Sequence, residues 1–108
     1  MPVTYIQGAE LPDVEVTWRD SDSSIINFST GYTFTVRLGQ LGQAATLTKT
    51  TGITGNNVSP NLLISWSSTE IESLPAATYT MEIIARHVAT SKDRKMHDTV
   101  IISAQVLP

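Results

Sequence analysis

The chain has 108 residues, close to the usual size of one domain and too few for two hydrophobic cores, so we expect a single domain over residues 1–108. Its net charge is −3 and it contains no long basic run, which argues against nucleic-acid binding and against attachment to a membrane surface. The sequence has no cysteine, which excludes a disulfide framework, a thiolate zinc site and a cysteine nucleophile.

The composition is typical of a globular protein rich in β-strands. Hydrophobic residues make up 41% and charged residues only 16%, below the usual quarter or so, and Thr and Ser fill the difference. Residues Met1 to Thr4 lack the charged segment and apolar core of a signal peptide, and no apolar run reaches the length of a membrane span. We therefore expect a protein that stays in cytosol-like conditions unless it leaves the cell inside a particle.

Two strands and two turns are predicted in the N-terminal part. Residues 3–6 are expected to form a short first strand, and residues 11–13 then turn the chain. In residues 14–19 apolar and polar side chains alternate, which is typical of a half-buried strand and places Trp18 in the core. The residues at 20–24 all favour a turn through hydrogen bonds from side chain to backbone.

The middle of the chain contains a clear strand and a thinner one. Residues 25–28 are expected to form a short strand or a packed loop, and the alternation over 32–38 predicts a strand. Residues 44–51 also alternate, but Ala and Thr leave the inner face thin, so we expect this strand at the edge of a sheet. Residues 52–57 tolerate positive φ, and the chain is expected to reverse there.

A further strand and one helical turn come next. Residues 61–67 place their apolar side chains, including Trp66, on one face of a strand. Residues 68–74 break this alternation with a Ser or Thr cap and early acidic residues. Because Ile71 and Leu74 lie three positions apart, we expect a single helical turn that plugs one end of a sandwich.

The rest of the chain is organised around residues 74–86. Pro75 fixes its own φ and pushes Leu74 toward an extended conformation, so the chain is redirected before a strand of period two begins. Tyr79 follows this corner, as in the tyrosine corner of immunoglobulin-like sandwiches, where the ring packs inside and the hydroxyl bonds to backbone a few residues upstream. The alternative is a Tyr packed on a strand without that hydrogen bond.

A polar tip at residues 90–95 and a last strand over 100–106 complete the pattern. About seven to eight strands with turn residues between them predict an all-β fold, an immunoglobulin-like antiparallel β-sandwich with one short helical turn near 68–74. The apolar faces of the strands must meet in one core. The expected core members are Trp18, Phe34, Trp66, Tyr79, Ile83 and Ile102.

The two histidines are the first candidates for catalysis. His87 and His97 are expected to flank the 90–95 tip and to lie near one another across a hairpin. Asp98 follows His97, but adjacent residues on a strand point to opposite faces, so this pair would not share a site. We interpret both histidines as surface or hairpin-end residues and predict no catalytic residue.

Two groups of acidic residues raise the alternatives of a calcium site and a glycosidase site. Residues 20–24 have the oxygen spacing of a calcium loop but lack the Gly and the distant Glu of the EF-hand pattern, so a turn is favoured. Glu70 and Glu72, with Asp13 or Asp98, show no spacing that would place two carboxylates on opposite sides of a bond. We therefore favour a capping role for these acids and predict no metal site and no cofactor-binding residue.

Four segments carry a resemblance to a known family. They are Trp18–Asp22, Gly31–Leu38, Leu47–Gly55 and Leu74–Tyr79. These segments resemble small tail and baseplate modules of tailed bacteriophages, including the immunoglobulin-like N-terminal module of baseplate upper proteins, and the similarity spans about residues 13–106. The resemblance implies a virion component that assembles symmetrically and has no catalytic residues. Those modules usually carry Gly where Ala77 stands, so a positive φ is not expected at that corner.

The function we expect is that of a non-enzymatic bacteriophage virion structural protein, a minor tail or baseplate component. Its expected partners are other virion proteins and copies of itself, and its location is the virion, assembled in the host bacterial cytoplasm. The alternatives are a capsid decoration protein and a carbohydrate-binding β-sandwich module with a host surface glycan as partner. Only Tyr5 and Tyr32 are not assigned to the core and could serve such a sugar site.

The contact surface for assembly is expected at strand edges. An unpaired edge can be completed by a neighbour's strand, which favours the first strand, the last strand and the thin 44–51 strand. A Lys at Thr46 or Thr48 should then block assembly without disturbing the core. The competing contact surface is the polar tip at 90–95.

Overall fold

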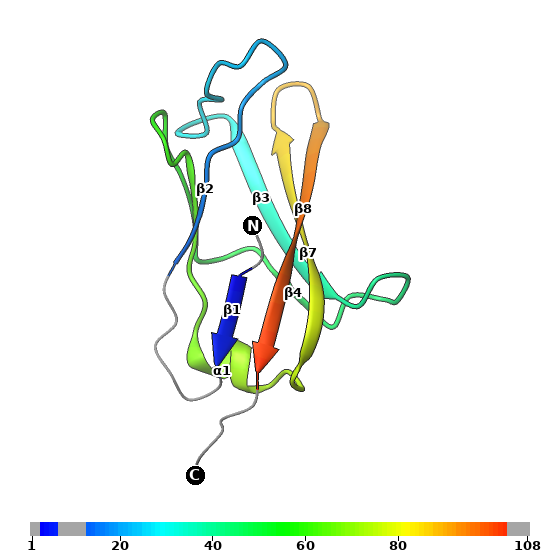
Figure 1. Cartoon of the computed structure of the whole chain (residues 1–108). Coiled ribbons are helices and arrows are strands. Elements are labelled where there is room, and N and C mark those ends of the chain that lie inside the picture. The colour runs from blue at the N-terminus through cyan, green and yellow to red at the C-terminus, as the bar shows by residue number, and fades with distance from the viewer. Residues whose placement is uncertain (1–2, 7–12, 104–108) are drawn as a thin grey trace.

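Two β-sheets pack over one core in the structure, a computed structural model that describes residues 3–6 and 13–103 (Figure 1). The larger sheet has the strand order β1 (Val3–Ile6), β8 (Lys92–Ser103), β7 (Ala77–His87), β3 (Tyr32–Gly39) and β4 (Leu47–Lys49). The smaller sheet has the order β2 (Val14–Val16), β6 (Leu62–Ile64) and β5 (Ile53–Gly55). A short helix, α1 (Ser68–Glu72), follows β6 and lies at the lower end of the sandwich in Figure 1.

This architecture confirms the predicted all-β sandwich, with one difference in strand direction. The order of β8, β7 and β3 in one sheet and of β2, β6 and β5 in the other is that of the G, F, C and B, E, D strands of an immunoglobulin-like sandwich. The described pairings are antiparallel except that of β1 with β8, which is parallel from Val3↔Val100 to Ile6↔Ser103. The larger sheet is therefore mixed rather than antiparallel throughout.

The strand at the centre of the larger sheet is β7, the segment on which the sequence pattern is clearest. Its inner positions are buried from Tyr79 to Ala85, and the residues between them are more exposed. The Tyr79 hydroxyl donates a hydrogen bond of 2.7 Å to the carbonyl of Pro75. The tyrosine corner is thus confirmed over a simple packed Tyr. Ala77 does not have a positive φ.

The predicted helical turn is also confirmed. Ser67 is the N-cap of α1: its hydroxyl accepts a hydrogen bond of 3.1 Å from the backbone N–H of Glu70. The Glu70 carboxylate accepts one of 2.8 Å from the Ser67 N–H in return, which completes a capping box. Ile71 and Leu74 are buried in the core, so the turn plugs the sandwich as expected.

The predicted core is buried in its lower and middle parts but not at the loops. Four of its members are buried: Trp66, Tyr79, Ile83 and Ile102. Trp18 and Phe34 are only partly buried against this core, and the prediction is wrong for them. Trp18 lies beyond the end of β2. Phe34 is on β3, but the ring it packs against, Phe28, belongs to a loop and not to a strand of the smaller sheet. Tyr5, which the sequence left unassigned, is 1% exposed.

Several element boundaries differ from the predicted ones. The reversal expected at 52–57 is only partly right, because Ile53–Gly55 is strand β5. Gly52 has the positive φ that was expected, and the chain reverses between β5 and β6, where the Asn56 N–H bonds to the Asn61 carbonyl. Residues 25–28 form a packed loop with one bridge, from Ile25 to Arg19.

The predicted edges are right for the first strand and the thin strand but wrong for the last one, because residues 100–103 of β8 lie between β1 and β7. The thin strand is only Leu47–Lys49 and does lie at the sheet edge. The hairpin turn occupies residues 88–91, so the predicted tip at 90–95 is partly strand, because β8 already begins at Lys92. Residues 11–12, where we expect a turn, and the predicted strand positions after Ser103 lie outside the described residues.

Candidate functional site

The two histidines lie on opposite faces of the β7–β8 hairpin. His87 pairs with Lys92, whereas His97 pairs with Glu82 farther along the hairpin. The centres of the His87 and Tyr32 rings are 5.1 Å apart, and Nδ1 of His87 lies 3.0 Å from the Thr90 hydroxyl oxygen. His97 is exposed. The expectation that they lie near one another is therefore wrong, because the register separates them both in position and in face.

The acidic loop at residues 20–24 is a turn held by its own side chains. The Asp20 N–H donates to the Ser24 carbonyl at 2.8 Å, and Asp22 Oδ1 accepts from the Ser24 N–H at 3.0 Å. The backbone N–H of Ser21 and the nearby Arg94 lower the pKa of Asp20. The predicted turn is confirmed. Within residues 3–6 and 13–103 there is no group of three or more His, Asp or Glu side chains that could hold a metal ion.

The remaining acidic candidates each have a separate local role. Asp13 Oδ1 accepts a hydrogen bond of 2.8 Å from the Ser65 hydroxyl. Asp98 stands opposite Met81 on the β7–β8 ladder. Glu70 caps α1 as predicted and also binds a lysine, whereas Glu72 is exposed at the end of the helix. The predicted capping role is thus confirmed for Glu70 alone, whereas Asp13 and Asp98 accept local hydrogen bonds.

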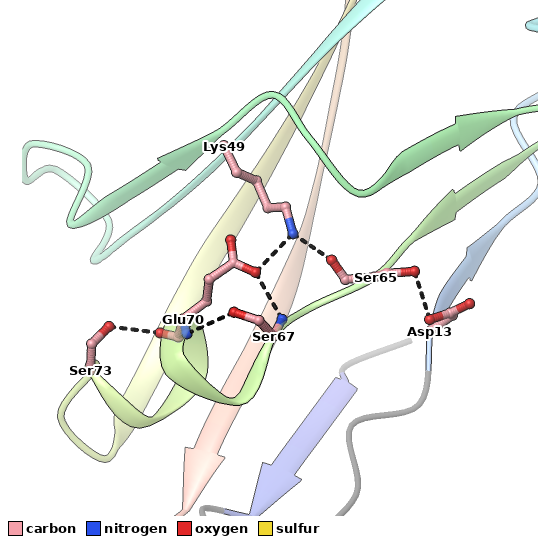
Figure 2. A network of polar contacts seen from close by, with 6 residues as sticks. All are labelled: Asp13, Lys49, Ser65, Ser67, Glu70 and Ser73. Carbon is pink, nitrogen blue, oxygen red and sulfur yellow. Dashed lines mark hydrogen bonds and ion pairs between the residues drawn. The ribbon is translucent and has the colours of Figure 1, made fainter.

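A buried lysine is the main polar feature that the sequence did not reveal (Figure 2). The Lys49 side chain is 5% exposed, and its ammonium contacts Glu70 Oε1 at 3.1 Å. The same ammonium donates to the carbonyl of Ser65 and lies 4.5 Å from the centre of the Trp66 ring. Burial alone would raise the pKa of Glu70, but the Ser67 N–H and Lys49 outweigh it and hold the pKa below its usual value. This network joins edge strand β4 to the segment that leads into α1.

An aromatic cluster occupies the opposite end of the sandwich. Phe28 is 2% exposed and meets the rings of Trp18, Tyr32 and Phe34 edge-on, with ring centres 4.9 to 5.5 Å apart. The three outer rings are partly exposed. A pocket of about 340 Å³ opens beside them, lined by Tyr32, His87, Thr90, Lys92, Asp93 and Arg94. Its aromatic face and polar rim are features that small-molecule sites combine.

The last strand has an open edge. β8 pairs with β7 from Lys92 to Ile102, but β1 covers its other side only from Val100 to Ser103. In the described part of the chain, Lys92 to Thr99 therefore has a strand on one side only, and Figure 1 shows β1 beside just the lower part of β8. Since inter-strand hydrogen bonds alternate, every second residue of this stretch directs its N–H and C=O away from β7.

No family model matches this chain, and no match was found among the curated proteins or the solved structures. None of the helices in the described ranges is long and apolar enough to cross a membrane. Three features of the described residues bear on the function: the open edge of β8, the aromatic pocket and the Lys49 network.

Proposed function

We propose that this chain is a non-enzymatic structural module that assembles with other protein chains through its open strand edges. The observation that carries this proposal is the edge of β8 from Lys92 to Thr99, which has a neighbouring strand on one side only among the described residues. An exposed edge is a template for a strand of another chain, because its backbone groups are already aligned for pairing. The short edge strand β4 offers a second, smaller contact of the same kind.

The composition of the β8 edge favours a matched partner over indiscriminate aggregation. Its first half carries charged residues from Lys92 to Lys95, and such charges block pairing with strands that do not complement them. Its second half, from Met96 to Thr99, is less charged and is the part next to β1. A partner must therefore supply complementary charge at one end of the edge and apolar contact near its middle.

The setting we propose for this assembly is the virion of a tailed bacteriophage, as a minor tail or baseplate component. This part of the proposal is supported by the resemblance of residues 13–106 to tail and baseplate modules, and by the tyrosine corner that an immunoglobulin-like module would have. A capsid decoration protein would use the same edges, and it differs only in the place that the protein occupies on the particle.

Localisation on intact particles tests the proposal. A copy with a small tag on the exposed loop around Val58, which is 63% exposed and lies between β5 and β6 of the smaller sheet rather than beside the β8 or β4 edge, should be made during infection and imaged by cryo-electron microscopy. Label on the tail or baseplate supports the proposed place, and label on the head favours decoration. Purified particles without the tagged chain, from cells in which it is folded and abundant, would contradict a virion role.

A second candidate function, a carbohydrate-binding module, is favoured by one observation. The Tyr32 ring is partly exposed in the pocket beside His87, and sugars stack on such rings while charged side chains bind their hydroxyls. NMR titration of the wild type with common bacterial surface sugars should shift the Tyr32 and His87 signals if the pocket binds them. The variant His87→Ala should lose these shifts, whereas Gln40→Ala, at the other end of β3, should keep them. The absence of shifts at high sugar concentration would contradict this candidate.

A further inference from the structure

We propose that two copies of this chain pair antiparallel along β8, about a two-fold axis that passes Met96. This inference rests on the proposed assembly role and names one partner for it, a second copy of the same chain. Pairing of identical strands about a two-fold axis is isologous: if one residue of the first copy contacts a second residue of the other copy, the same contact also occurs with the two copies exchanged. The dimer would join two five-stranded sheets edge to edge.

The length of the open edge fits this pairing. The edge runs from Lys92 to Thr99, and β1 occupies the same side of β8 from Val100 onward. A two-fold axis at Met96 places Asp93 opposite Thr99 of the second copy. The paired stretch thus ends in both copies just before β1 begins, and neither β1 strand has to move.

The inner row of β8 is self-complementary in charge. Arg94, Met96 and Asp98 stand opposite Ala85, Ile83 and Met81 of β7. Those three β7 residues are all 0% exposed, so the β8 row lies on the core side of the sheet. An axis at Met96 sets Arg94 of each copy against Asp98 of the other. Two ion pairs would then flank one contact between apolar Met side chains, and directly opposed opposite charges stabilise antiparallel strands.

The contacts that Arg94 already makes leave room for this additional one. Its two terminal nitrogens lie 3.4 Å from the Asp20 carboxylate oxygens, which is long for a charged hydrogen bond. The Tyr32 side chain is a second hydrogen-bond partner of Arg94. A guanidinium has five N–H donors in a planar fork, so donors remain for a further carboxylate. A carboxylate has two oxygens that can each accept more than one hydrogen bond, and the Thr99 N–H donates one bond of 2.8 Å to Asp98 Oδ1.

The neighbouring register is less favourable. An axis at Lys95 would set Lys92 against Asp98, which attract each other, but it would also set two Lys95 side chains directly against each other at the centre. Like charges directly opposed destabilise a strand pair, and Arg94 would then face Met96 instead of an acidic residue. The outer row in the favoured register sets Lys95 against His97, which repel each other only when the imidazole is protonated. The two registers differ in the residue on the axis, and that difference can be measured.

Cysteine cross-linking tests the register, because the natural chain has no cysteine. Residues directly opposite in an antiparallel pair have Cα atoms about 4.5–5.5 Å apart, which is within the range of a disulfide. Met96→Cys should therefore give a covalent dimer under mild oxidation, and Lys95→Cys should give much less. A covalent dimer from Lys95→Cys but not from Met96→Cys would overturn the proposed axis.

Charge complementation tests the partner. Arg94→Glu alone sets Glu against Asp98, and Asp98→Arg alone sets Arg against Arg94, so each variant should remain monomeric where the wild type is dimeric. A mixture of the two should form a heterodimer, since both opposed pairs then attract. Sedimentation of each variant and of the mixture measures this, with circular dichroism to confirm that both variants are folded. Recovery in the mixture cannot result from misfolding of either variant.

The outcome is separable from that of the proposed function. A wild-type chain that sediments as a monomer at all accessible concentrations, or a mixture that does not recover, overturns pairing along β8. Localisation on the particle would still decide whether the chain is a virion component that binds other proteins. If the chain forms the β8 dimer in solution but is absent from particles, pairing along β8 is supported and the proposed virion setting is contradicted.

Discussion

The two ends of the sandwich are closed by different physical means. At the helix end, Ile71 and Leu74 fill the core, and directional polar contacts fix the surrounding segments: the Tyr79 hydroxyl on Pro75 and the Lys49 ammonium on Glu70. Each of these contacts has one geometry and a defined partner. The helix end therefore depends on a few specific hydrogen bonds and ion pairs.

The loop end depends instead on aromatic packing and on one buried amide. Phe28 sits among three partly exposed rings, and the fully buried Asn61 fixes the loop above them. Asn61 accepts a hydrogen bond from the Trp18 N–H at 2.7 Å and donates to the Trp18 and Ile26 carbonyls at 2.8 Å. The backbone of this loop is thus held while its outer rings stay accessible, which suits a surface that meets other molecules. Substitutions at the two ends should therefore fail in different ways.

The largest effect is expected at the loop end, for Phe28→Ala. Removal of a fully buried ring that contacts three others should lower the free energy of unfolding by about 3–5 kcal/mol. Urea denaturation followed by circular dichroism measures this. Phe34→Ala is the matched control, because Phe34 is partly exposed and should cost less, about 1–3 kcal/mol. Equal losses for the two variants would contradict the proposed central role of Phe28.

The helix end should lose stability at alkaline pH through one buried phenol. Tyr5, opposite Ile102 on β8, is buried, and its burial together with the nearby Asp13 raises its pKa to about 12 from an ordinary value of 10.0. The folded state therefore favours the neutral phenol. The contribution of the neutral Tyr5 phenol to the free energy of unfolding is fully present below pH 10. It is lost as the pH rises toward 12, and the loss amounts to about 2–3 kcal/mol.

This prediction is checked by urea unfolding of the wild type and of Tyr5→Phe between pH 9 and pH 12. The wild type should lose more stability than Tyr5→Phe across that window, because only the wild type has a phenol at this position that ionises in the unfolded state before it ionises in the folded state. Parallel curves for the two proteins would show that other groups account for the alkaline loss.

The next largest effect is expected for Lys49→Met, which should lower the free energy of unfolding by about 1–3 kcal/mol. The substitution keeps the apolar stem but leaves Glu70 and the Ser65 carbonyl without the ammonium, and unpaired polar groups are costly where they are buried. The double variant Lys49→Met with Glu70→Gln should regain part of the loss. A double variant that is less stable than Lys49→Met would show that the charge of Glu70 stabilises the fold even without the ammonium, because Gln can still complete the capping box.

The same network makes a prediction on the acid side. The pKa of Glu70 is lowered in the folded protein, so its contribution is present above its ordinary value and is lost as the pH falls through the folded-state pKa. In Lys49→Met that lowering is smaller, and the variant should lose less stability on acidification than the wild type does. Unfolding midpoints measured from pH 7 down to pH 3 compare the two.

The sequence predicted which residues share a face far better than how deeply each one is buried. Period two identified the strands and the inner row of β7, and local capping chemistry identified α1, because both depend on neighbours in the chain. Trp18 and Phe34 lie on the predicted face but near the loops, where depth depends on what another segment covers. Periodicity contains no information about that covering segment.

The candidate site was less predictable because it depends on register and on distant partners. A lysine in a thin edge strand is expected to face solvent, and Lys49 is buried only because Trp66 and Glu70 arrive from another part of the chain. The two histidines were placed together because they flank a polar tip, but the true turn at 88–91 shifts the register and separates them. The open edge of β8 was not predicted: the last strand was expected only over 100–106, where β1 covers it, whereas the open stretch from Lys92 to Thr99 includes part of the expected polar tip.

The smallest effect is expected for Tyr79→Phe, and it tests the feature that the sequence predicted most directly. The variant keeps the buried ring and removes only the hydrogen bond from the hydroxyl to the Pro75 carbonyl. Pro75 is exposed, so water can replace the lost donor, and we expect a loss of about 1 kcal/mol in the free energy of unfolding. Tyr32→Phe at the loop end is the comparison, since it removes a hydroxyl near Arg94 from a partly exposed residue and should change stability by no more than about 0.5 kcal/mol. If both variants unfold at the same urea concentration as the wild type, the corner hydrogen bond does not stabilise the helix end. Closure there must then come from the burial of Ile71 and Leu74 alone, and the distinction between the two ends becomes one of packing only.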